Sequence, residues 1–522
     1  MNSGRGGKRP RPASPARRPP DAERPAAAPR PPRQRPRGAA PVAAAPAAPA
    51  RVDRSRAAHV KRRPPAPAPE LPDELDEWST QPARDKAVRD KGARFGRRSP
   101  AGPRENPGQR RAIALDEPGP GGPRRPLSHV GGRVERLDGP GELKAIIQRA
   151  LDIDPEQGVR DHVHGFHSYP ARLHPVTAGQ LVRGLSPERG SVGDPFCGCG
   201  TVLVEARRLG RKAIGVDLNP LAVRLTRFKT QPLAPDQLDE LVAAATRVTE
   251  HAEERRLASA GPTHRYAPAE RDAFDVHVLL ELDGLAHGIK QEQPGYLRQA
   301  LGLSLSSIFS KVGRDTTGAE GPSKRLASGF TIRFFQSRVG ELVRQLAEYA
   351  ALLPEKAPGV QVREADARQL GELGLKNIDL FVSSPPYPGV LDYAAYHRTR
   401  LNWLNIDATE FERLEMGARR HLQSLDHERA AATWEADFAR VLRAMRAALA
   451  PEGYIALVLA DSLLAGKPYP ADVVVERCAA RAGLELVARG SQRRPHFHRQ
   501  SAKAFGDRTR YEHLLLLTSA PP

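Results

Sequence analysis

Asp194-Pro-Phe-Cys-Gly-Cys-Gly-Thr201 is the stretch of sequence that decides the fold, because it joins a short apolar run to a helical pattern. The run Ser191 to Phe196 predicts a strand, Val202 to Leu209 a helix, and Lys212 to Leu218 a second buried strand. A strand, a glycine-rich turn, a helix and a strand in this order are typical of an α/β unit that binds a nucleotide. The two glycines allow the backbone to approach a ligand closely.

The second strand of this unit ends at an acid. Asp217 can bind both hydroxyls of a ribose, as the acid at this position does in nucleotide-binding folds. A dinucleotide fingerprint would place Gly or Ala at position 203, where this chain has Leu203. The pattern therefore indicates an adenosyl ligand and argues against NAD or FAD.

A second informative stretch, Ser384-Pro-Pro-Tyr387, follows the apolar run Ile378 to Ser383. The prolines fix φ and remove two N–H donors, so nearby carbonyl groups can face the amino group of a ligand. Tyr387 adds an aromatic face, which suits a base that has left the duplex. The other interpretation is a simple end of a strand, since paired prolines often do only that.

Together these stretches resemble the two signature motifs of the amino-group DNA methyltransferases of the cytosine-N4 and adenine-N6 type, which use S-adenosylmethionine. The resemblance extends over about 360 residues, from near position 160 to the end. It implies a Rossmann-like α/β methyltransferase fold and these catalytic residues: Ser384, Pro385, Pro386 and Tyr387. It also implies these residues for binding S-adenosylmethionine: Asp194, Phe196, Gly198, Gly200, Thr201, Asp217, Asp366 and, in the segment at the methionine end, Tyr169 and Pro170.

The family pattern also bears on the methylated atom. Serine in the second motif is typical of enzymes that act on cytosine N4, whereas Asp or Asn usually marks adenine N6. Cytosine-N4 enzymes commonly carry the catalytic motif first, however, and this chain carries the cofactor motif first. Cys199 also stands where Ser is frequent. We expect methylation of cytosine N4 in double-stranded DNA with the base flipped out, as in restriction-modification. The alternatives are adenine N6, guanine N2 in RNA, and a catalytically silent nucleic-acid-binding protein.

The expected chemistry needs neither a covalent intermediate nor a metal. The Ser384 hydroxyl and the Pro385 carbonyl can accept hydrogen bonds from the amino group and favour a pyramidal nitrogen. A cytosine-C5 enzyme would carry a nucleophilic cysteine in the Pro-Pro loop, and none is there. The histidines between positions 162 and 174 and the two cysteines of the turn do not have the spacing of structural zinc sites. We therefore predict no metal, and these side chains as polar lining of the cleft.

Charge and composition divide the 522 residues. The net charge is +20, and residues 1–130 hold 29 of the basic and 13 of the acidic residues together with 26 of the 50 prolines. We predict a disordered basic tail there. It is either a tether that binds the phosphates of a polyanion, or an inert linker, or the result of a start codon assigned too far upstream in the gene. Three cysteines make no disulfide framework, which favours a cytoplasmic protein. No apolar run reaches the length of a membrane span.

Residues 131–522 are predicted to form the methyltransferase domain. Strands alternate with helices, which predicts a mostly parallel sheet with both faces covered, and the last two strands, Leu484 to Arg489 and Tyr511 to Thr518, should pair antiparallel. Between residues 231 and 358 the alternation breaks. An insertion of this length beside a site favours target recognition, and a structural lid or scaffold is the alternative. The sequence gives no oligomeric state.

Overall fold

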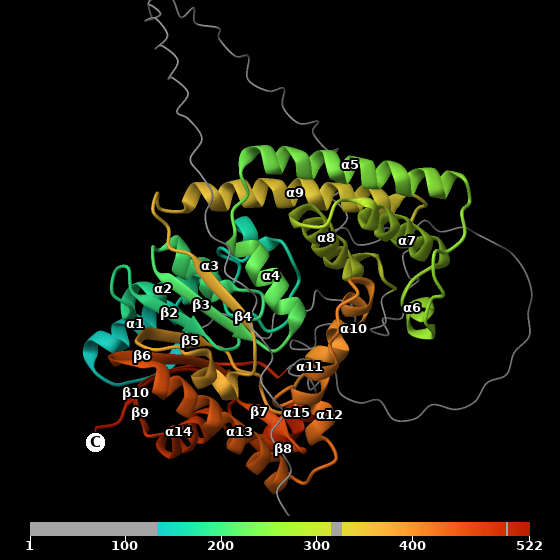
Figure 1. Cartoon of the computed structure of the whole chain (residues 1–522). Coiled ribbons are helices and arrows are strands. Elements are labelled where there is room, and N and C mark those ends of the chain that lie inside the picture. Colours follow the sequence, from blue (N-terminus) through green and yellow to red (C-terminus); the bar gives the residue numbers. More distant parts are fainter. Residues whose placement is uncertain (1–132, 315–325, 497–498, 522) are drawn as a thin grey trace, which may run out of the picture. The chain divides into compact units, whose positions relative to one another are not determined.

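The computed structural model describes residues 133–314, 326–496 and 499–521. The tail predicted at residues 1–130 lies outside the described residues, and so do Lys324 and Arg325 of the predicted insertion. Within the described residues, the chain forms a central sheet with helices on both faces and a further group of helices, shown at the top and right of Figure 1.

The central sheet has eight strands in the order β1-β9-β10-β6-β5-β2-β3-β4. Five neighbouring strands run parallel: β6 (Leu449–Ala460), β5 (Ile378–Ser383), β2 (Ser191–Asp194), β3 (Lys212–Asp217) and β4 (Val360–Glu364). Strand β10 (Tyr511–Ser519) pairs antiparallel with both β6 and β9 (Leu484–Arg493), which confirms the predicted antiparallel pair. Strand β1 (Val134–Asp138), which the sequence did not predict, adds an antiparallel edge beside β9.

Helices cover both faces of the sheet because successive residues of a strand point to opposite sides. Leu380 and Val382 of β5 pack in one apolar cluster with α1 (Gly141–Leu151), α2 (Pro175–Leu185) and α3 (Thr201–Arg208). Phe381, between them, packs in another with α13 (His427–Ala448) and α14 (Ala471–Ala482). Two buried faces explain why the parallel strands read as continuous apolar runs.

The helix after β3 begins as its sequence predicts. Helix α4 (Pro220–Thr230) has Pro220 in its first turn, and the side chain of Asn219 accepts a hydrogen bond from the Leu221 N–H at 3.0 Å. Proline has no N–H to leave unpaired at this position, and asparagine satisfies one of the free donors of the first turn. Asn219 and its neighbours therefore stay at the carboxyl end of β3.

The predicted insertion is helical in its described part. It contains α5 (Pro235–Leu257), α6 (Pro268–Ala273), α7 (Val276–Gln291), α8 (Tyr296–Val312) and α9 (Phe330–Leu352). Helices α5 and α9 lie side by side along the top of Figure 1. Leu241 of α5 and Leu342 of α9 belong to the same buried cluster as Phe166 and Leu221. The insertion thus shares a hydrophobic core with the elements around β3.

Elements along the carboxyl edge of the sheet were largely missed by sequence analysis. They are the 3₁₀ turns η3 (His162–Gly165) and η4 (Ala367–Leu373), helices α10 (Tyr393–Trp403), α11 (Thr409–Leu414), α12 (Arg419–Leu422) and α15 (Arg499–Phe505), and the hairpin of β7 (Ser462–Leu464) and β8 (Lys467–Tyr469). Helix α13 begins at His427, where the Asp426 side chain accepts the Arg429 N–H at 2.9 Å.

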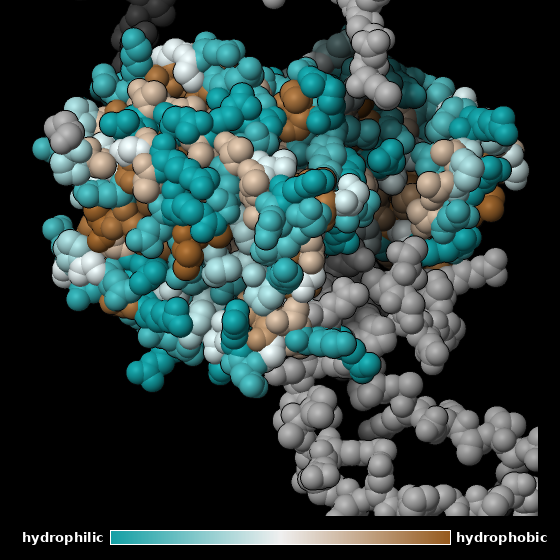
Figure 2. Space-filling model, turned by 90° about the horizontal axis from the view of Figure 1, so that it is seen from below, coloured by the Kyte–Doolittle hydropathy of each residue, from teal (hydrophilic) through white to brown (hydrophobic). Residues whose placement is uncertain are grey.

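The surface is mostly polar. Figure 2 shows hydrophilic side chains over most of the face seen from below, with apolar residues in separate patches. Among the described residues, the exposed large apolar side chains are Val242, Leu257, Val276, Leu352 and Val473. Scattered apolar residues are ordinary on protein surfaces and indicate no docking face. Within the described ranges, no helix has both the length and the apolar character needed to cross a bilayer.

Candidate active site

A pocket lies where the parallel strands end, and residues of both predicted motifs line it. Its empty volume is about 890 Å³, part of it open to solvent, which is in the range of small-molecule sites. Asp194, Gly198, Asp217 and Ser384 are among the lining residues, so strands β2, β3 and β5 bring the two motifs together. The two motifs are far apart in the sequence but close in space, because parallel strands present their carboxyl ends at one edge of the sheet.

The glycine-rich turn is built on two residues with positive φ. Gly198 has φ +51° and Gly200 has φ +83°, a conformation that other residues adopt only with strain. A Cβ atom at Gly200 would lie 2.8 Å from the Thr226 side chain, and one at Gly198 would lie 3.3 Å from the Tyr169 ring. Glycine is therefore required at position 200 by packing as well as by backbone conformation.

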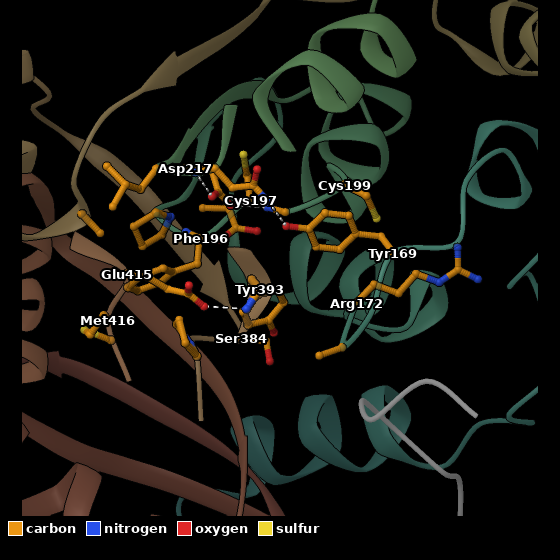
Figure 3. Close-up of a pocket in the computed structure, with 18 of the residues that line it drawn as sticks. Tyr169, Arg172, Phe196, Cys197, Cys199, Asp217, Ser384, Tyr393, Glu415 and Met416 are labelled. Atoms are coloured by element: carbon orange, nitrogen blue, oxygen red, sulfur yellow. Dashed lines mark hydrogen bonds between the residues drawn. The ribbon is translucent and has the colours of Figure 1, made fainter. Parts of the chain in front are cut away.

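Asp217 fixes this turn and also faces the pocket (Figure 3). Its carboxylate accepts hydrogen bonds from the N–H groups of Gly198 and Asn219, both at 2.8 Å, one on each oxygen. Each carboxylate oxygen has a further lone pair for a ligand hydroxyl. Burial raises the pKa of Asp217 to about 6, although these hydrogen bonds lower it.

Asp194 links the two motifs directly. Its Oδ1 accepts hydrogen bonds from the Ser383 hydroxyl at 2.7 Å and the Phe196 N–H at 3.1 Å. Ser383 precedes Ser384, so the end of β2 is tied to the start of the predicted catalytic loop. Burial raises the pKa of Asp194 to about 7, against the effect of both hydrogen bonds. The geometry gives Asp194 a structural contact that sequence analysis did not foresee.

The four residues of the predicted catalytic loop have different surroundings. Ser384 and Pro386 line the pocket, whereas Pro385 is buried behind it. The Pro386 carbonyl accepts a hydrogen bond from the Trp434 indole N–H at 3.2 Å, which holds this part of the loop against α13. Tyr387 is half-buried, and its hydroxyl donates to Glu512 of β10 at 3.4 Å. Tyr387 does not line the pocket.

The segment around Tyr169 forms the opposite wall. Tyr169 lines the pocket and accepts a hydrogen bond from the Asn219 amide at 3.1 Å, while Pro170 lies just outside the lining. The Tyr169 ring stacks on His397 with a centroid distance of 4.8 Å and lies 6.3 Å from the Tyr393 ring. Ala171, also in the lining, has φ +52°, so this wall carries local backbone strain.

The remaining cofactor residues predicted from sequence also reach the pocket. Phe196, Thr201 and Asp366 line it, while Gly200 lies at the start of α3 below it. Asp366 is paired with Arg368, whose guanidinium contacts both of its carboxylate oxygens at 2.6 to 2.9 Å. Arg368 also bonds Asp437 at 2.8 Å, so Asp366 is held in place by a charged network.

Part of the pocket wall comes from residues that sequence analysis missed. Phe411, Leu414, Glu415 and Met416 close the side opposite β3. The Glu415 carboxylate accepts the N–H groups of Tyr393 at 2.6 Å and Ala394 at 3.3 Å, which are free donors of the first turn of α10, and the Tyr393 contact is drawn in Figure 3. Glu415 also pairs with Arg420 at 2.7 Å, but no local pattern marks its role at α10, because the two N–H groups that it accepts lie 21 and 22 residues away.

The cysteines of the turn are thiols in a buried environment. Cys197, Cys199 and Cys478 are free and buried. Burial raises the pKa of Cys197 well above its ordinary value, and the neighbouring Asp217 and Asp194 raise it further. A thiol with a raised pKa is a poor nucleophile. That neither cysteine of the turn attacks the substrate stays a prediction.

Two groups of metal-type side chains come together among the described residues. One contains His162, His164 and Glu205, and the other contains Asp461, Asp472 and His513. In the first group Glu205 is held by Arg208 at 2.6 Å as well as by His164 at 3.0 Å, and the Lys229 ammonium is another buried cation nearby. These cations oppose binding of a metal ion. In the second group Asp461 already accepts the N–H groups of Ala471 and Tyr511. The absence of a metal stays a prediction.

With the site described, the chain can be compared with known proteins. Residues 141–228 match the DNA methylase family that joins N6 and N4 enzymes. The matched stretch runs from α1 to α4, includes the glycine-rich turn and Asp217, and ends before the Ser384 loop. It is therefore shorter than the 360 residues over which the sequence resembles the family.

Two curated relatives are Type II methyltransferases. M.MvaI of Kocuria varians is 34% identical over 87 residues, which are 16% of this chain and 19% of that protein. M.MjaII of Methanocaldococcus jannaschii is 35% identical over 101 residues, which are 18% of each protein. The matched segments thus span about a fifth of the length of these relatives.

Solved structures align weakly. A TehB-like SAM-dependent methyltransferase from Corynebacterium glutamicum gives a TM-score of 0.25 at 10% identity, with 66% of this chain and 86% of that chain covered. An rRNA methyltransferase from Streptomyces viridochromogenes gives 0.21 at 17% identity, with 56% and 77% covered. Scores this low add no argument about function.

The sheet is Rossmann-like, and the segment that builds the glycine-rich turn and Asp217 is similar to DNA methylases. The family match and the two relatives support placing the chain among the amino-group DNA methyltransferases. The same matches support S-adenosylmethionine as the methyl donor, and the pocket fits it, since Gly198 without a side chain, Asp217 at the end of β3 and apolar walls surround a space of suitable size.

Proposed function

We propose that the chain methylates the N4 amino group of cytosine in double-stranded DNA, acting on a base that has left the helix. The observation that carries the proposal is the position of Ser384, which lines the same pocket as Gly198 and Asp217. A serine hydroxyl at this place can accept a hydrogen bond from an amino group, and the family pattern associates serine here with cytosine N4. The matched segments cover less than a fifth of this chain, so the substrate of the whole protein is a proposal.

The roles of the residues follow from their contacts. S-adenosylmethionine, when bound, supplies an electrophilic methyl group. Asp217 is placed to bind the ribose hydroxyls, and Gly198 and Gly200 give the backbone room to approach the ligand. The Pro386 carbonyl already accepts a hydrogen bond from Trp434 and Pro385 lies outside the pocket lining, so the Ser384 hydroxyl is proposed as the main acceptor for the N–H groups of the base. Accepting these hydrogen bonds directs the nitrogen lone pair toward the cofactor side.

Tyr387 is proposed to hold the base by stacking. Glu512 anchors its hydroxyl, and Glu512 is itself paired with Arg494 at 2.7 Å in a pair that is 1% exposed on both sides. Because the hydroxyl is fixed from β10, the orientation of the ring is set by the sheet and not by the loop alone. Tyr393, which lines the pocket, is a second aromatic residue available to the base.

The helical insertion at residues 231–358 is proposed to recognise the target sequence. Its described part carries Arg265, Arg271 and Arg333 with exposed side chains, which can contact phosphates or bases. The shared core around Leu241 fixes these helices beside the cofactor site, as target recognition requires. The tail at residues 1–130 is proposed to add contacts to phosphates that carry no sequence information.

Nucleoside analysis tests the proposal. The chain should be expressed in a host free of DNA methylation, with a Ser384→Ala variant as control, and digested DNA and RNA should be examined by mass spectrometry. We expect 4-methylcytosine in DNA with the parent chain and a strong reduction with the variant. Finding 6-methyladenine would assign the chain to the adenine-N6 enzymes, and modified guanine confined to RNA would contradict a DNA substrate.

A further inference from the structure

A buried arginine lies at the junction between the insertion and the methyltransferase core. Arg400 is on α10, seven residues after the pocket residue Tyr393, and is 5% exposed. Seven residues are two helical turns, or about 10 Å along the axis. Arg400 therefore lies on the same face of α10 as Tyr393, at the end that adjoins the insertion.

The contacts of Arg400 hold its guanidinium in one position. Its Nε donates to the Ser306 carbonyl of α8 at 3.1 Å, and its NH2 donates to the Ser168 hydroxyl at 3.3 Å. The guanidinium carbon lies 5.5 Å from the centre of the Tyr396 ring. The Ser168 hydroxyl is also 3.4 Å from the Ser310 hydroxyl of α8. The guanidinium thus has acceptors on both sides of the junction, the Ser306 carbonyl of α8 and the Ser168 hydroxyl, and the Ser310 hydroxyl lies next to Ser168.

The charge of Arg400 has no counterion in the described part of the chain. No carboxylate among the described residues lies within 4.0 Å of it. The nearby His167 and His397 cannot supply negative charge, and burial, together with Arg400 itself, lowers the pKa of each imidazole well below its ordinary value. A buried charge is costly unless it is paired. An arginine held this way is suited to an external oxyanion, which its planar fork can bind through two hydrogen bonds.

The exposed residues of this site lie outside the cofactor pocket. Ser168 and Ser310 are both exposed, and neither they nor Arg400 line the pocket, although the adjacent Tyr169 does. An oxyanion at Arg400 would thus sit beside a base in the pocket without occupying it. A phosphodiester of the strand that carries the base meets this description better than the carboxylate of the cofactor, whose place is inside the pocket.

We propose that Arg400, Ser168 and Ser310 form a subsite for one backbone phosphate of the DNA strand that carries the target base. The inference rests on the proposed function for the identity of the ligand. The subsite would fix the strand at the junction of insertion and core, two helical turns of α10 from Tyr393. Its contribution is to position the strand, so it acts alike on every DNA sequence.

Salt-dependent DNA binding of the full chain tests the subsite. Binding to a short duplex should be measured by fluorescence anisotropy between about 50 and 200 mM salt. For Arg400→Gln we expect affinity to fall roughly tenfold and the magnitude of the log–log salt slope to fall by about 0.9, the value for one phosphate contact. Arg400→Lys should retain most of the slope, because the charge remains. Arg440→Gln is the matched control, since Arg440 is an arginine of α13 that is half-exposed and paired with Asp437 at 3.7 Å.

Two milder variants keep the test valid if Arg400→Gln does not fold. Ser168→Ala and Ser310→Ala remove exposed hydroxyls and should each weaken DNA binding about two- to tenfold with the salt slope unchanged. Thr433→Ala, which removes an exposed hydroxyl of α13, should have no effect. Normal DNA affinity in both serine variants would overturn the proposal.

Titration calorimetry with S-adenosylmethionine distinguishes the two sources of an oxyanion. Arg400→Gln should bind the cofactor as the parent does. Loss of cofactor affinity with an unchanged DNA salt slope would assign Arg400 to the cofactor carboxylate and overturn the phosphate subsite. A parent chain that binds DNA with the expected dependence on Arg400 but transfers no methyl group would contradict the proposed function and leave the subsite in place.

Discussion

Replacement of Asp217 by Asn tests the cofactor site at its most constrained residue. The Asp217 carboxylate holds the Gly198 and Asn219 N–H groups at 2.8 Å and also faces the pocket. Asparagine has the same size but one acceptor oxygen and no charge, so one N–H loses its partner and the ribose hydroxyls meet a weaker acceptor. An unpaired buried N–H costs about 1–3 kcal/mol, and a hydrogen bond to a charged group contributes about 1.5–3 kcal/mol.

These magnitudes give separate expectations for folding and for binding. The free energy of unfolding should fall by about 1–3 kcal/mol, and the Kd for S-adenosylmethionine should rise roughly 10- to 150-fold. Urea unfolding measures the first and titration calorimetry the second. Both should be done at pH 8, because burial places the pKa of Asp217 at about 6 and the carboxylate is ionised there.

Asp379→Asn is the matched control. Asp379, at the other end of β5, accepts hydrogen bonds from the Ser191 N–H at 2.7 Å and the Ser191 hydroxyl at 2.8 Å, and it does not line the pocket. Its replacement should reduce stability to a similar extent and leave cofactor affinity unchanged. If Asp217→Asn binds the cofactor as tightly as the parent, the ribose is not at Asp217. If both variants lose affinity alike, the loss reflects a loosened sheet.

Further predictions concern pH, the catalytic loop and the tail. Burial raises the pKa of Asp194 from 3.8 to about 7, so the folded chain binds this proton more tightly than the unfolded chain; the stability from protonated Asp194 is complete below about pH 4 and lost as pH rises through about 7. As the pH rises from 5 to 8, the free energy of unfolding of Asp194→Asn should therefore increase relative to that of the parent. A difference between the two free energies that does not change with pH would contradict the raised pKa. Tyr387→Ala should keep cofactor affinity and lose most methyl transfer, because stacking on a base contributes about 1–3 kcal/mol, whereas Tyr387→Phe should retain transfer; equal loss of cofactor binding in Tyr387→Ala would place the ring under the cofactor. Deletion of residues 1–130 should reduce the salt dependence of DNA binding and preserve site preference in a methylation assay, and an unchanged slope would make the tail a linker.

The parts of the fold that sequence predicted well are those with local causes. Strand β5 was predicted with its observed ends, Ile378 and Ser383, because a strand buried on both faces is a continuous apolar run and paired prolines stop it. The start of α4 follows from Asn219 and Pro220 in the same way. Where a residue's conformation depends on its immediate neighbours, the sequence contains the necessary information.

The parts that were missed depend on partners far along the chain. Glu415 has no distinctive neighbours, yet its carboxylate completes the first turn of α10 across 21 and 22 residues. The hydroxyl of Tyr387 contacts Glu512, 125 residues later, and no pattern near Tyr387 indicates this partner. Strand β1 is a short edge strand with mostly exposed residues, so its pairing with β9 leaves no clear apolar pattern. Such features arise from tertiary contacts that no local window shows.

The long insertion is compatible with the sheet because its first and last helices match. Helices α5 and α9 have 23 residues each and pack against one another, so one takes the chain about 34 Å out and the other returns it. The chain therefore returns to β4, next to the strand β3 from which it departed. The intervening helix α8 meets α10 through the Ser306 carbonyl and Arg400. Since α10 begins six residues after Tyr387 and its Tyr393 stacks on Tyr169, this helix contacts both the insertion and the pocket wall and follows the predicted catalytic loop. Helix α10 therefore links the insertion to the pocket wall.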